Sequence, residues 1–421
     1  MAVTLITNIH QLVNTREKNK LLRGKDLSEL PLIENAWIKL ENKRIAAYGR
    51  MEELAGTAGP SSFEMIDARR ASVLPCWCDS HTHLVFAGDR QEEFVDKIKG
   101  LTYAEISAKG GGILNTAKKL QDTSEVELFN LAWKRLEEVG RLGTGAIEIK
   151  SGYGLTLESE LKILRVIKKL KEKSALSIRS TFLGAHSYPE AYRENHQAYI
   201  ELIIKKMLPA VSEEKLADYI DVFCEKGFFS PEETETICRA GMEYGLKPKL
   251  HVNQLNSLGG IQTGIKLNAI SLDHLETLSE KDIQFLSGQV PGNPWNGVCT
   301  LLPTAAFFMR VPFQPARRLI DAGCAVALAS DFNPGTSPSG NMSLVISLSC
   351  IQMRMLPEEA LNAATINGAY AMGLESEVGS ITVGKKANLI FTKPVPSMAY
   401  LPYSFGTNLV AKVMLEGEFI S

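Results

Sequence analysis

The feature that most constrains the fold is a repeated alternation between Val73 and Tyr370, in which each short apolar segment is followed by polar residues and then by a longer amphipathic segment. The stretch 157–173, for example, carries apolar residues at helical spacing and comes after an apolar stretch at 145–150 with strand character. The segments with strand character are 72–78, 145–150, 177–185, 219–225, 247–252, 269–275, 298–304 and 325–330. Eight strands that alternate with helices predict a TIM-type (β/α)8 barrel rather than an open sheet.

The two ends of the sequence resemble each other and differ from this middle part. The first part contains short β segments at 3–8, 36–41 and 44–49, and the tail contains further β segments at 379–392 and 411–420. We therefore predict a small, β-sandwich-like domain composed of residues 1–72 and 372–421, beside a barrel domain of residues 73–371.

The charge and the cysteines argue against several classes of protein. Lys and Arg number 46 against 48 Asp and Glu, which gives a net charge of -2, and no dense basic run suggests a nucleic-acid partner. The seven cysteines are scattered without C-x-x-C pairs, which is typical of reduced thiols. The sequence begins without a signal-peptide pattern and has no apolar run of about 20 residues. We expect a cytoplasmic protein that does not bind membranes.

Polar residues with metal-binding or proton-transfer chemistry fall at the ends of the predicted strands. In a TIM barrel, the catalytic side chains come from the carboxyl ends of the strands, which all meet at one mouth. The residues at these places are His81 and His83 for the first strand, His186 for the third, Glu225 for the fourth, His251 for the fifth, Asp273 and His274 for the sixth, and Asp331 for the eighth.

The pair His81 and His83 predicts a metal site once it is combined with residues from other strands. Side chains two positions apart on a strand point to one side, about 6 to 7 Å apart. Alone, H-x-H is a weak signal, but His251 and Asp331 face the same mouth. Imidazole and carboxylate ligands suit Zn²⁺ or Fe.

A metal at this place would support hydrolysis. It lowers the pKa of bound water toward 7 and polarises a carbonyl, so that an amide can be attacked at neutral pH. The attack also needs a proton acceptor and a proton donor, for which Asp331 and His274 are the candidates. The alternative for His274 is a supporting or core histidine.

In this order, the residues resemble the amidohydrolase superfamily, whose members carry H-x-H on the first barrel strand and an Asp on the eighth. The tail "GSITVGKKANLI" also fits, although the usual Asp of that motif is Asn388 here. Within the superfamily, the chain resembles the imidazolonepropionase family over nearly its whole length, in "DSHTHLVFAGDR", "EIKSGYGL", "HVNQLNSLGG" and "SDFNPGT". The resemblance implies hydrolysis of 4-imidazolone-5-propanoate to N-formimidoyl-L-glutamate in histidine degradation.

The resemblance also implies the residues of the site. It implies the metal ligands His81, His83, His251 and Asp331, and we expect one ion per subunit. It implies substrate contacts from Arg90, Tyr153, His186, Gln254, Asn333, Gly335 and Thr336.

Simple physical reasons support two of these substrate contacts. A guanidinium at Arg90 suits bidentate capture of the propanoate, with a structural salt bridge as the alternative. Glycines on both sides leave the ring of Tyr153 free to face a ligand, with plain packing as the alternative. Tyr103 and the loop 110–112 are further candidates near the mouth.

Gln254 departs from the family pattern. Many amidohydrolases have a proton-shuttling Glu three residues after the histidine of strand five, whereas this chain has His251-Val-Asn-Gln254. Glutamine orients a ring but does not relay a proton, so proton transfer passes to His274 and Asp331, and deamination becomes less favoured. Glu225 raises the separate question of a second metal. We expect one metal, with Glu225 holding neighbouring loops.

Two other functions remain open at this point. One is another cyclic amidohydrolase or an aminohydrolase of purines or pyrimidines, against which Arg90 argues because such rings carry no propanoate. The other is a non-catalytic scaffold of the same fold, for which Gln254 is the only support. Barrels of this family often pair, so we expect a homodimer.

Overall fold

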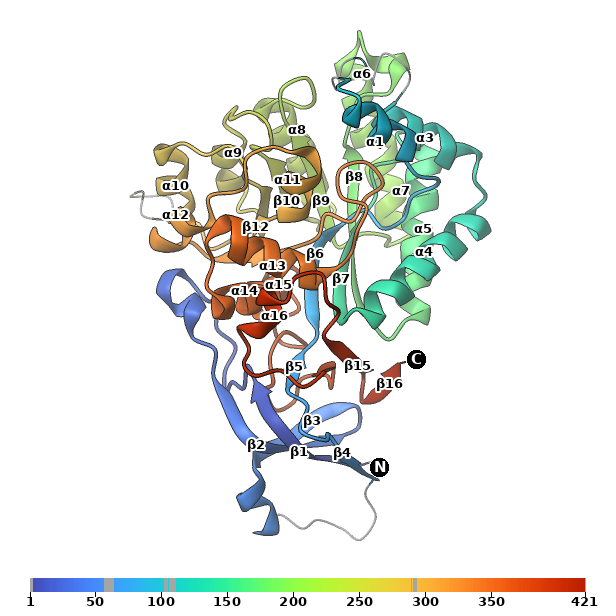
Figure 1. Cartoon of the computed structure of the whole chain (residues 1–421). Coiled ribbons are helices and arrows are strands. Elements are labelled where there is room, and N and C mark those ends of the chain that lie inside the picture. The colour runs from blue at the N-terminus through green and yellow to red at the C-terminus, as the bar shows by residue number, and fades with distance from the viewer. Residues whose placement is uncertain are drawn as a thin grey trace.

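The core of the structure is a barrel of eight parallel strands (Figure 1). The computed structural model describes residues 3–56, 64–101, 105, 111–288, 290 and 294–420. The barrel strands, in the order in which they neighbour one another, are β6 (Trp77–Thr82), β7 (Thr144–Lys150), β8 (Ser177–Ala185), β9 (Tyr219–Cys224), β10 (Lys247–Val252), β11 (Ser271–His274), β12 (Val298–Leu301) and β13 (Val326–Leu328). Most of their residues are buried, because helices cover the outside and side chains fill the inside.

Backbone hydrogen bonds close the barrel between β6 and the segment after β13. The N–H of Asp331 donates to the carbonyl of His81 at 3.0 Å, and the N–H of His83 donates to the carbonyl of Phe332 at 2.9 Å. Thr82 and Phe332 form a parallel bridge at the same place. This closing seam therefore joins the two segments that carry the H-x-H motif and Asp331.

The helices that follow the strands surround the barrel (Figure 1). They are α1 (Gln91–Ile98), α3 (Ile113–Asp122), α4 (Glu125–Arg141), α5 (Leu157–Lys173), α6 (His196–Leu202), α7 (Leu208–Glu213), α8 (Pro231–Glu243), α9 (Gly260–Lys266), α10 (Glu280–Leu286), α11 (Pro303–Met309), α12 (Ala316–Asp321), α13 (Met342–Met353), α14 (Pro357–Ala363), α15 (Ile366–Ala371) and α16 (Tyr400–Tyr403). In the part of the chain that the structure describes, no helix combines the length and apolar character needed to span a bilayer.

The small domain is a second sheet to which both ends of the chain contribute (Figure 1). Its strands are β1 (Val3–Val13), β2 (Leu32–Glu41), β3 (Arg44–Arg50), β4 (Glu64–Asp67), β5 (Val73–Pro75), β14 (Leu389–Thr392), β15 (Val410–Leu415) and β16 (Glu418–Ile420). Asn388 ties this sheet to the barrel, because its amide donates to the carbonyl of Gly145 at 3.3 Å while its oxygen accepts from the N–H of Glu416 at 2.8 Å. The predicted fold class, a barrel with a small β domain from both termini, is confirmed.

The first predicted barrel strand, 72–78, is wrong in its limits. Residues 73–75 form β5 of the small sheet, where Pro75 pairs with Leu389. The N–H of Trp77 then bonds the carbonyl of Gly143, and the barrel strand continues to Thr82. The pairing partners change at Cys76, so one apolar run serves two sheets, and His81 lies inside β6 instead of after it. The limits of the two domains stay a prediction.

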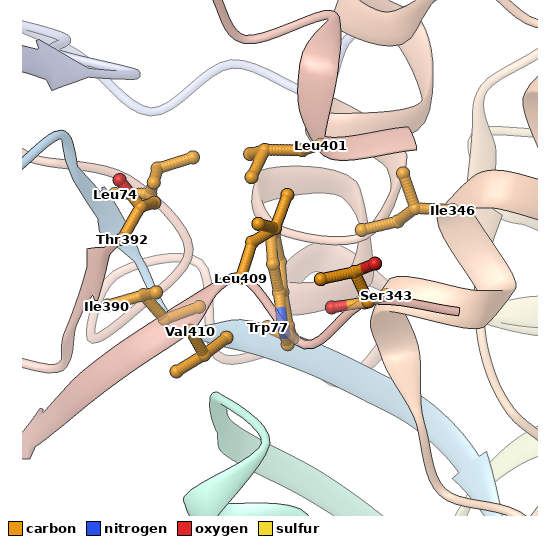
Figure 2. A pocket seen from close by; sticks show the side chains of 10 residues that line it. Leu74, Trp77, Ser343, Ile346, Ile390, Thr392, Leu401, Leu409 and Val410 are labelled. Atoms are coloured by element: carbon orange, nitrogen blue, oxygen red, sulfur yellow. The ribbon is translucent and has the colours of Figure 1, made fainter. Parts of the chain in front are cut away.

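Trp77 fills the contact between the small sheet and the barrel. Figure 2 shows its indole among side chains from both parts, and these leave a cavity of about 20 Å³. The labelled lining residues are Leu74, Trp77, Ser343, Ile346, Ile390, Thr392, Leu401, Leu409 and Val410. Gly143 packs against the same place: a Cβ there would lie 2.7 Å from Ile390 Cδ1 and 2.8 Å from Trp77 Nε1. The two parts therefore fit closely only with glycine at this position.

We predict that Gly143→Ala destabilises the protein more than Gly245→Ala does. Both glycines have a positive φ, +103° and +80°, but a Cβ at Gly245 meets nothing within 4 Å. The shared backbone strain costs about 1–2 kcal/mol, and overpacking at Gly143 adds roughly 1–3 kcal/mol. Urea midpoints of both variants measure the difference. Equal losses would show that the interface yields to a methyl group.

Candidate metal centre and active site

The closing seam of the barrel brings together the ring nitrogens and the carboxylate that were predicted to bind a metal. His83 Nε2 lies 3.4 Å from His251 Nε2, and Asp331 Oδ1 lies 3.7 Å from Nε2 of both His81 and His83. In a tetrahedral site with Zn–N bonds of about 2.0–2.1 Å, neighbouring ligand atoms are about 3.3–3.4 Å apart. The ligand atoms of His81, His83 and Asp331 all lie within 4.8 Å of one another, a spacing that suits one common ion, and His251 lies beside them next to His83.

The outer nitrogens of the three rings are already engaged. His81 Nδ1 donates to Asp273 at 2.6 Å, His251 Nδ1 donates to Asp221 at 2.9 Å, and His83 Nδ1 lies 3.4 Å from the carbonyl of Ser151. Each Nε2 is thus left with a lone pair that faces the centre. Nε2 of His81 is buried without a hydrogen-bond partner among the described residues, which fits a position reserved for a metal.

The pKa shifts of the ligands prepare the site for a cation. Burial lowers the pKa of His81, His83 and His251 well below 6.5, and nearby cationic groups add to this, so the rings are neutral at pH 7. Burial also raises the pKa of Asp331 to about 6, although the charge of His274 opposes this. At neutral pH, all four ligands are therefore mainly in the deprotonated form that a metal needs.

His274 lies beside this cluster in a different electrostatic environment. Its ring centroid is 5.5 Å from that of His81 and 5.2 Å from that of His251. Burial disfavours its protonated form, but the carboxylates of Glu276, Asp331 and Asp273 outweigh burial and raise its pKa above 6.5. Glu276 Oε1 lies 3.4 Å from His274 Nδ1. His274 is therefore the histidine of the cluster best suited to carry a proton near neutral pH, and Glu276 is a partner that the sequence analysis missed.

The metal cluster opens into a cavity of about 410 Å³, a size that suits a small-molecule ligand. Aromatic, aliphatic and cationic side chains share its wall. The lining residues are His83, Arg90, Lys97, Leu101, Ile113, Tyr153, His186, Phe223, Phe228, His251, Gln254, Leu255, His274, Phe308, Met309, Arg310, Val311, Asp331, Asn333 and Thr336.

Arg90 offers a donor to this cavity. Its Nε donates to Thr116 at 2.8 Å, which fixes the guanidinium, whereas Nη2 is buried with no hydrogen-bond partner among the described residues. Gly335 makes room for it, because a Cβ there would collide with the guanidinium. Gly335 does not line the cavity but admits Arg90, and the substrate contact predicted for it stays a prediction.

Lys97 is a second cation in the wall that the sequence analysis missed. Its Nζ donates to the carbonyl of Gly335 at 3.4 Å, and it lies over the ring of Phe308 at 5.8 Å from the centroid. Burial lowers its pKa, and the neighbouring charge of Arg90 lowers it further. The available signal was that Lys97 lies on the helix α1, seven residues after Arg90, which is the residue that precedes this helix.

Tyr153 and His186 surround His83. The ring of His186 stacks on that of His83 at 5.1 Å between centroids, and Tyr153 lies 5.6 Å from His83. His186 Nδ1 lies 3.0 Å from the carbonyl of Gly152, whose φ of +108° needs glycine. Burial lowers the pKa of His186 to about 4, so its ring is neutral at pH 7.

Asn333 and Thr336 line the cavity but also hold the Asp331 loop. The Asn333 amide donates to the carbonyl of Asp331 at 2.6 Å and to Thr336 Oγ1 at 2.7 Å, and its oxygen accepts from two backbone N–H groups of the loop. The hydroxyl of Thr336 donates to Asp331 Oδ2 at 3.3 Å. Both residues therefore orient Asp331 whether or not they contact a ligand.

Gln254, which departs from the family pattern, and Glu225, which raised the question of a second metal, lie in different environments. Gln254 lines the cavity, and its amide nitrogen has a weak contact with Met309 Sδ at 3.9 Å. Glu225 accepts from the backbone N–H groups of Leu255 and Asn256 at 2.8 and 3.2 Å, and it does not line the cavity. Glu225 thus holds the loop after β10. Tyr103 and residue 110 lie outside the described residues.

Comparison with known proteins gives consistent matches over the chain. Residues 72–420 match the Amidohydrolase family. The chain is 55% identical to an imidazolonepropionase of Flavobacterium johnsoniae, over 99% of this chain and 100% of the relative. It is 52% identical to an imidazolonepropionase of Christiangramia forsetii, over 99% of both chains. Among solved structures, E. coli guanine deaminase has a similar fold, with a TM-score of 0.74 at 14% identity, over 100% of this chain and 99% of the other.

We predict that Zn²⁺ binding displaces a proton from this site at low pH. Because the pKa of Asp331 is about 6, metal-stripped wild-type protein at pH 5 should release about one proton more per bound Zn²⁺ than the Asp331→Asn variant does. Isothermal titration calorimetry in buffers of different ionisation enthalpy measures this number. At pH 5 a metal-bound water, with a pKa of about 7, keeps its protons and does not add to this number. Equal proton release by the two proteins would contradict the assignment of the proton to Asp331.

Proposed function

The chain belongs to the amidohydrolase family and, within it, to the imidazolonepropionases, and on this premise we propose how its site hydrolyses the ring amide of 4-imidazolone-5-propanoate. The resemblance expected from the sequence is confirmed, and the protein is a hydrolase of carbon–nitrogen bonds. The observation that carries the proposal is the placement of Arg90, with its buried Nη2 donor, in the wall of the same cavity onto which His83, His251 and Asp331 open.

The reaction consumes one water molecule. The water oxygen forms a bond to the ring carbonyl carbon, the carbon–nitrogen bond breaks, and the departing nitrogen gains a proton. The carbonyl becomes a carboxylate and the basic formimidoyl group keeps the second proton of the water, so N-formimidoyl-L-glutamate has one carboxylate more than the substrate at the same net charge. The site must therefore accept a proton from the water and deliver one to the nitrogen.

His81, His83, His251 and Asp331 would hold one Zn²⁺ or Fe ion. When bound, such an ion lowers the pKa of a coordinated water toward 7 and polarises the carbonyl. We favour a single ion because Glu225, the carboxylate that follows β9, accepts hydrogen bonds from Leu255 and Asn256 with its two oxygens. Glu225 is therefore engaged with this loop and not placed to bridge two metals. The chemistry of these ligands suits either metal.

Two residues divide the proton transfers. Asp331 presents Oδ1 to the histidines and keeps Oδ2 beside Thr336, so one carboxylate serves as ligand and accepts the proton of the attacking water. His274, whose pKa is raised by its carboxylate neighbours, delivers a proton to the departing nitrogen. Gln254 orients the ring through hydrogen bonds and takes no part in proton transfer.

Arg90 binds the propanoate, and Lys97 contributes a second positive charge. The guanidinium is held by Thr116 and presents its unpartnered nitrogen, which suits a carboxylate. Tyr153 and His186 contact the imidazolone ring from the side of His83. A purine or pyrimidine has no carboxylate for these cations, so they favour the propanoate over such rings.

The proposal extends to the setting of the enzyme. The seven cysteines are free thiols, which is usual in the reducing cytoplasm. We therefore place the protein in the cytoplasm, acting on a small molecule without nucleic acid or membrane as a partner. A homodimer stays a prediction.

The first test is the ultraviolet absorbance loss of freshly generated 4-imidazolone-5-propanoate, compared with its spontaneous decay. Wild-type protein should accelerate the loss, and His274→Ala should slow it by roughly 10²–10⁴-fold because the proton donor is missing. His196→Ala, which removes an exposed histidine outside the cavity, is the matched control and should keep full activity. Metal-loaded wild-type protein without activity would refute the reaction, and an active His274→Ala variant would refute the proton donor.

A second test measures what the cations contribute to carboxylate recognition. Imidazole-4-propanoate should inhibit wild-type protein roughly 10–100-fold better than 4-propylimidazole, since a charged hydrogen bond contributes about 1.5–3 kcal/mol. Arg90→Met should remove most of this preference and Lys97→Met a smaller part. Lys119→Met removes an exposed lysine outside the cavity and controls for net charge. A preference that survives Arg90→Met would exclude the propanoate role.

A further inference from the structure

A layer of charged side chains lies inside the barrel beneath the metal centre and does not line the cavity. It consists of Glu148, Lys150, Asp221, Lys249 and Asp273, each at most 1% exposed. Burying a charge is costly unless it is paired, so five charges in the core call for an explanation beyond packing. The hydrogen bonds of Lys150 supply one.

Lys150 connects the two carboxylates that hold the metal-site histidines. Its Nζ lies 2.8 Å from Asp221 Oδ2 and 3.4 Å from Asp273 Oδ2, and Glu148 fixes it from a third side at 2.7 Å. The same two oxygens accept the Nδ1–H bonds of His251 and His81, at 2.9 and 2.6 Å. One ammonium thus joins two carboxylate–histidine pairs from β9, β10, β11 and β6.

We propose that Lys150 is a positioning residue that holds His81 and His251 in the Nδ1–H tautomer and aims both Nε2 atoms at the metal. Each carboxylate can only accept, so the ring nitrogen that faces it must carry the hydrogen. Without the ammonium, Asp221 and Asp273 would face each other as two buried anions, and repulsion would turn them away from the rings. The inference rests on the ligand set of the proposed function.

Lys249 provides a matched control for this role. It is equally buried and bonds Glu148, but its other partners are the carbonyls of Ser80, at 3.3 Å, and Ala371, at 2.9 Å. It makes no hydrogen bond to Asp221 or Asp273 among the described contacts. Removing either ammonium leaves a similar hole and the same charge change, but only Lys150 touches the carboxylates of the histidines.

The experiment is a titration of metal-stripped, full-length protein with Zn²⁺ in competition with a chelating dye. Loss of a partner behind a metal ligand typically weakens metal binding 10–100-fold, so Lys150→Met should fall in this range. Lys249→Met should stay within about threefold of wild type, since it bonds neither carboxylate. Urea unfolding of both stripped variants shows whether they are destabilised alike. Equal Zn²⁺ affinities of the two variants would overturn the proposal.

A spectroscopic measurement keeps the proposal testable if Lys150→Met does not fold. Lys150→Gln retains a donor of similar size without the charge, and the chain has only seven histidines to label with 15N. Nitrogen spectra of the stripped protein should show pure Nδ1–H tautomers for His81 and His251 in wild type and mixed tautomers in Lys150→Gln. His83, whose Nδ1 partner is a backbone carbonyl, is the internal reference. Unchanged tautomers in the variant would refute the role of Lys150.

These readouts separate the inference from the proposed function, because they use Zn²⁺ and no substrate. If wild-type protein binds Zn²⁺ and Lys150→Met weakens that binding, the positioning role stands even when no imidazolone is hydrolysed. If wild-type protein hydrolyses the substrate while Lys150→Met keeps full Zn²⁺ affinity, the reaction stands and the positioning role falls.

Discussion

The backbone bonds that close the barrel are the constraint on which the site depends. Because Asp331 donates to the carbonyl of His81 and His83 donates to that of Phe332, closure of the barrel and assembly of three metal ligands are one event. The ligands sit on or beside strands whose register is set by ladders on both sides, so their spacing follows from the main chain and not from flexible side chains. Asp331 has a φ of +52°, and its place in the seam holds this uncommon conformation.

Beneath this seam, the interior is charged where a barrel core is usually apolar. Three carboxylates and two ammonium groups leave one excess negative charge, and Asp331 adds another at the centre above. Such a core is unfavourable without pairing, yet its short bonds satisfy nearly all of its members. The excess negative charge lies where a metal cation would bind, so a bound cation would offset the unfavourable free energy of these buried charges.

Much of this arrangement could be predicted from the sequence, since strand periodicity and strand-end residues depend only on local pattern. The barrel and the grouping of His81, His83, His251 and Asp331 near one mouth belong to this class. Other features depend on contacts that no local pattern encodes. The division of the run 72–78 between two sheets is set by pairing with distant strands. The sequence alone does not distinguish Lys97 from a solvated helix residue, because its role depends on the placement of α1 over the cavity. It also does not distinguish Lys150 from an ordinary polar residue of a strand, because its partners come from other strands of the barrel.

The small sheet has a consequence for synthesis on the ribosome. Strand β5 lies between β1 and β14 in the sheet, but β14 comes more than 300 residues later in the chain. At about 5–20 residues per second, the nascent chain would expose that edge for roughly 15–60 s. An open strand edge is a template for wrong pairing. β5 has only three residues and ends in Pro75, which lacks an amide donor, so the edge that waits longest for its partner is also a poor template for other chains.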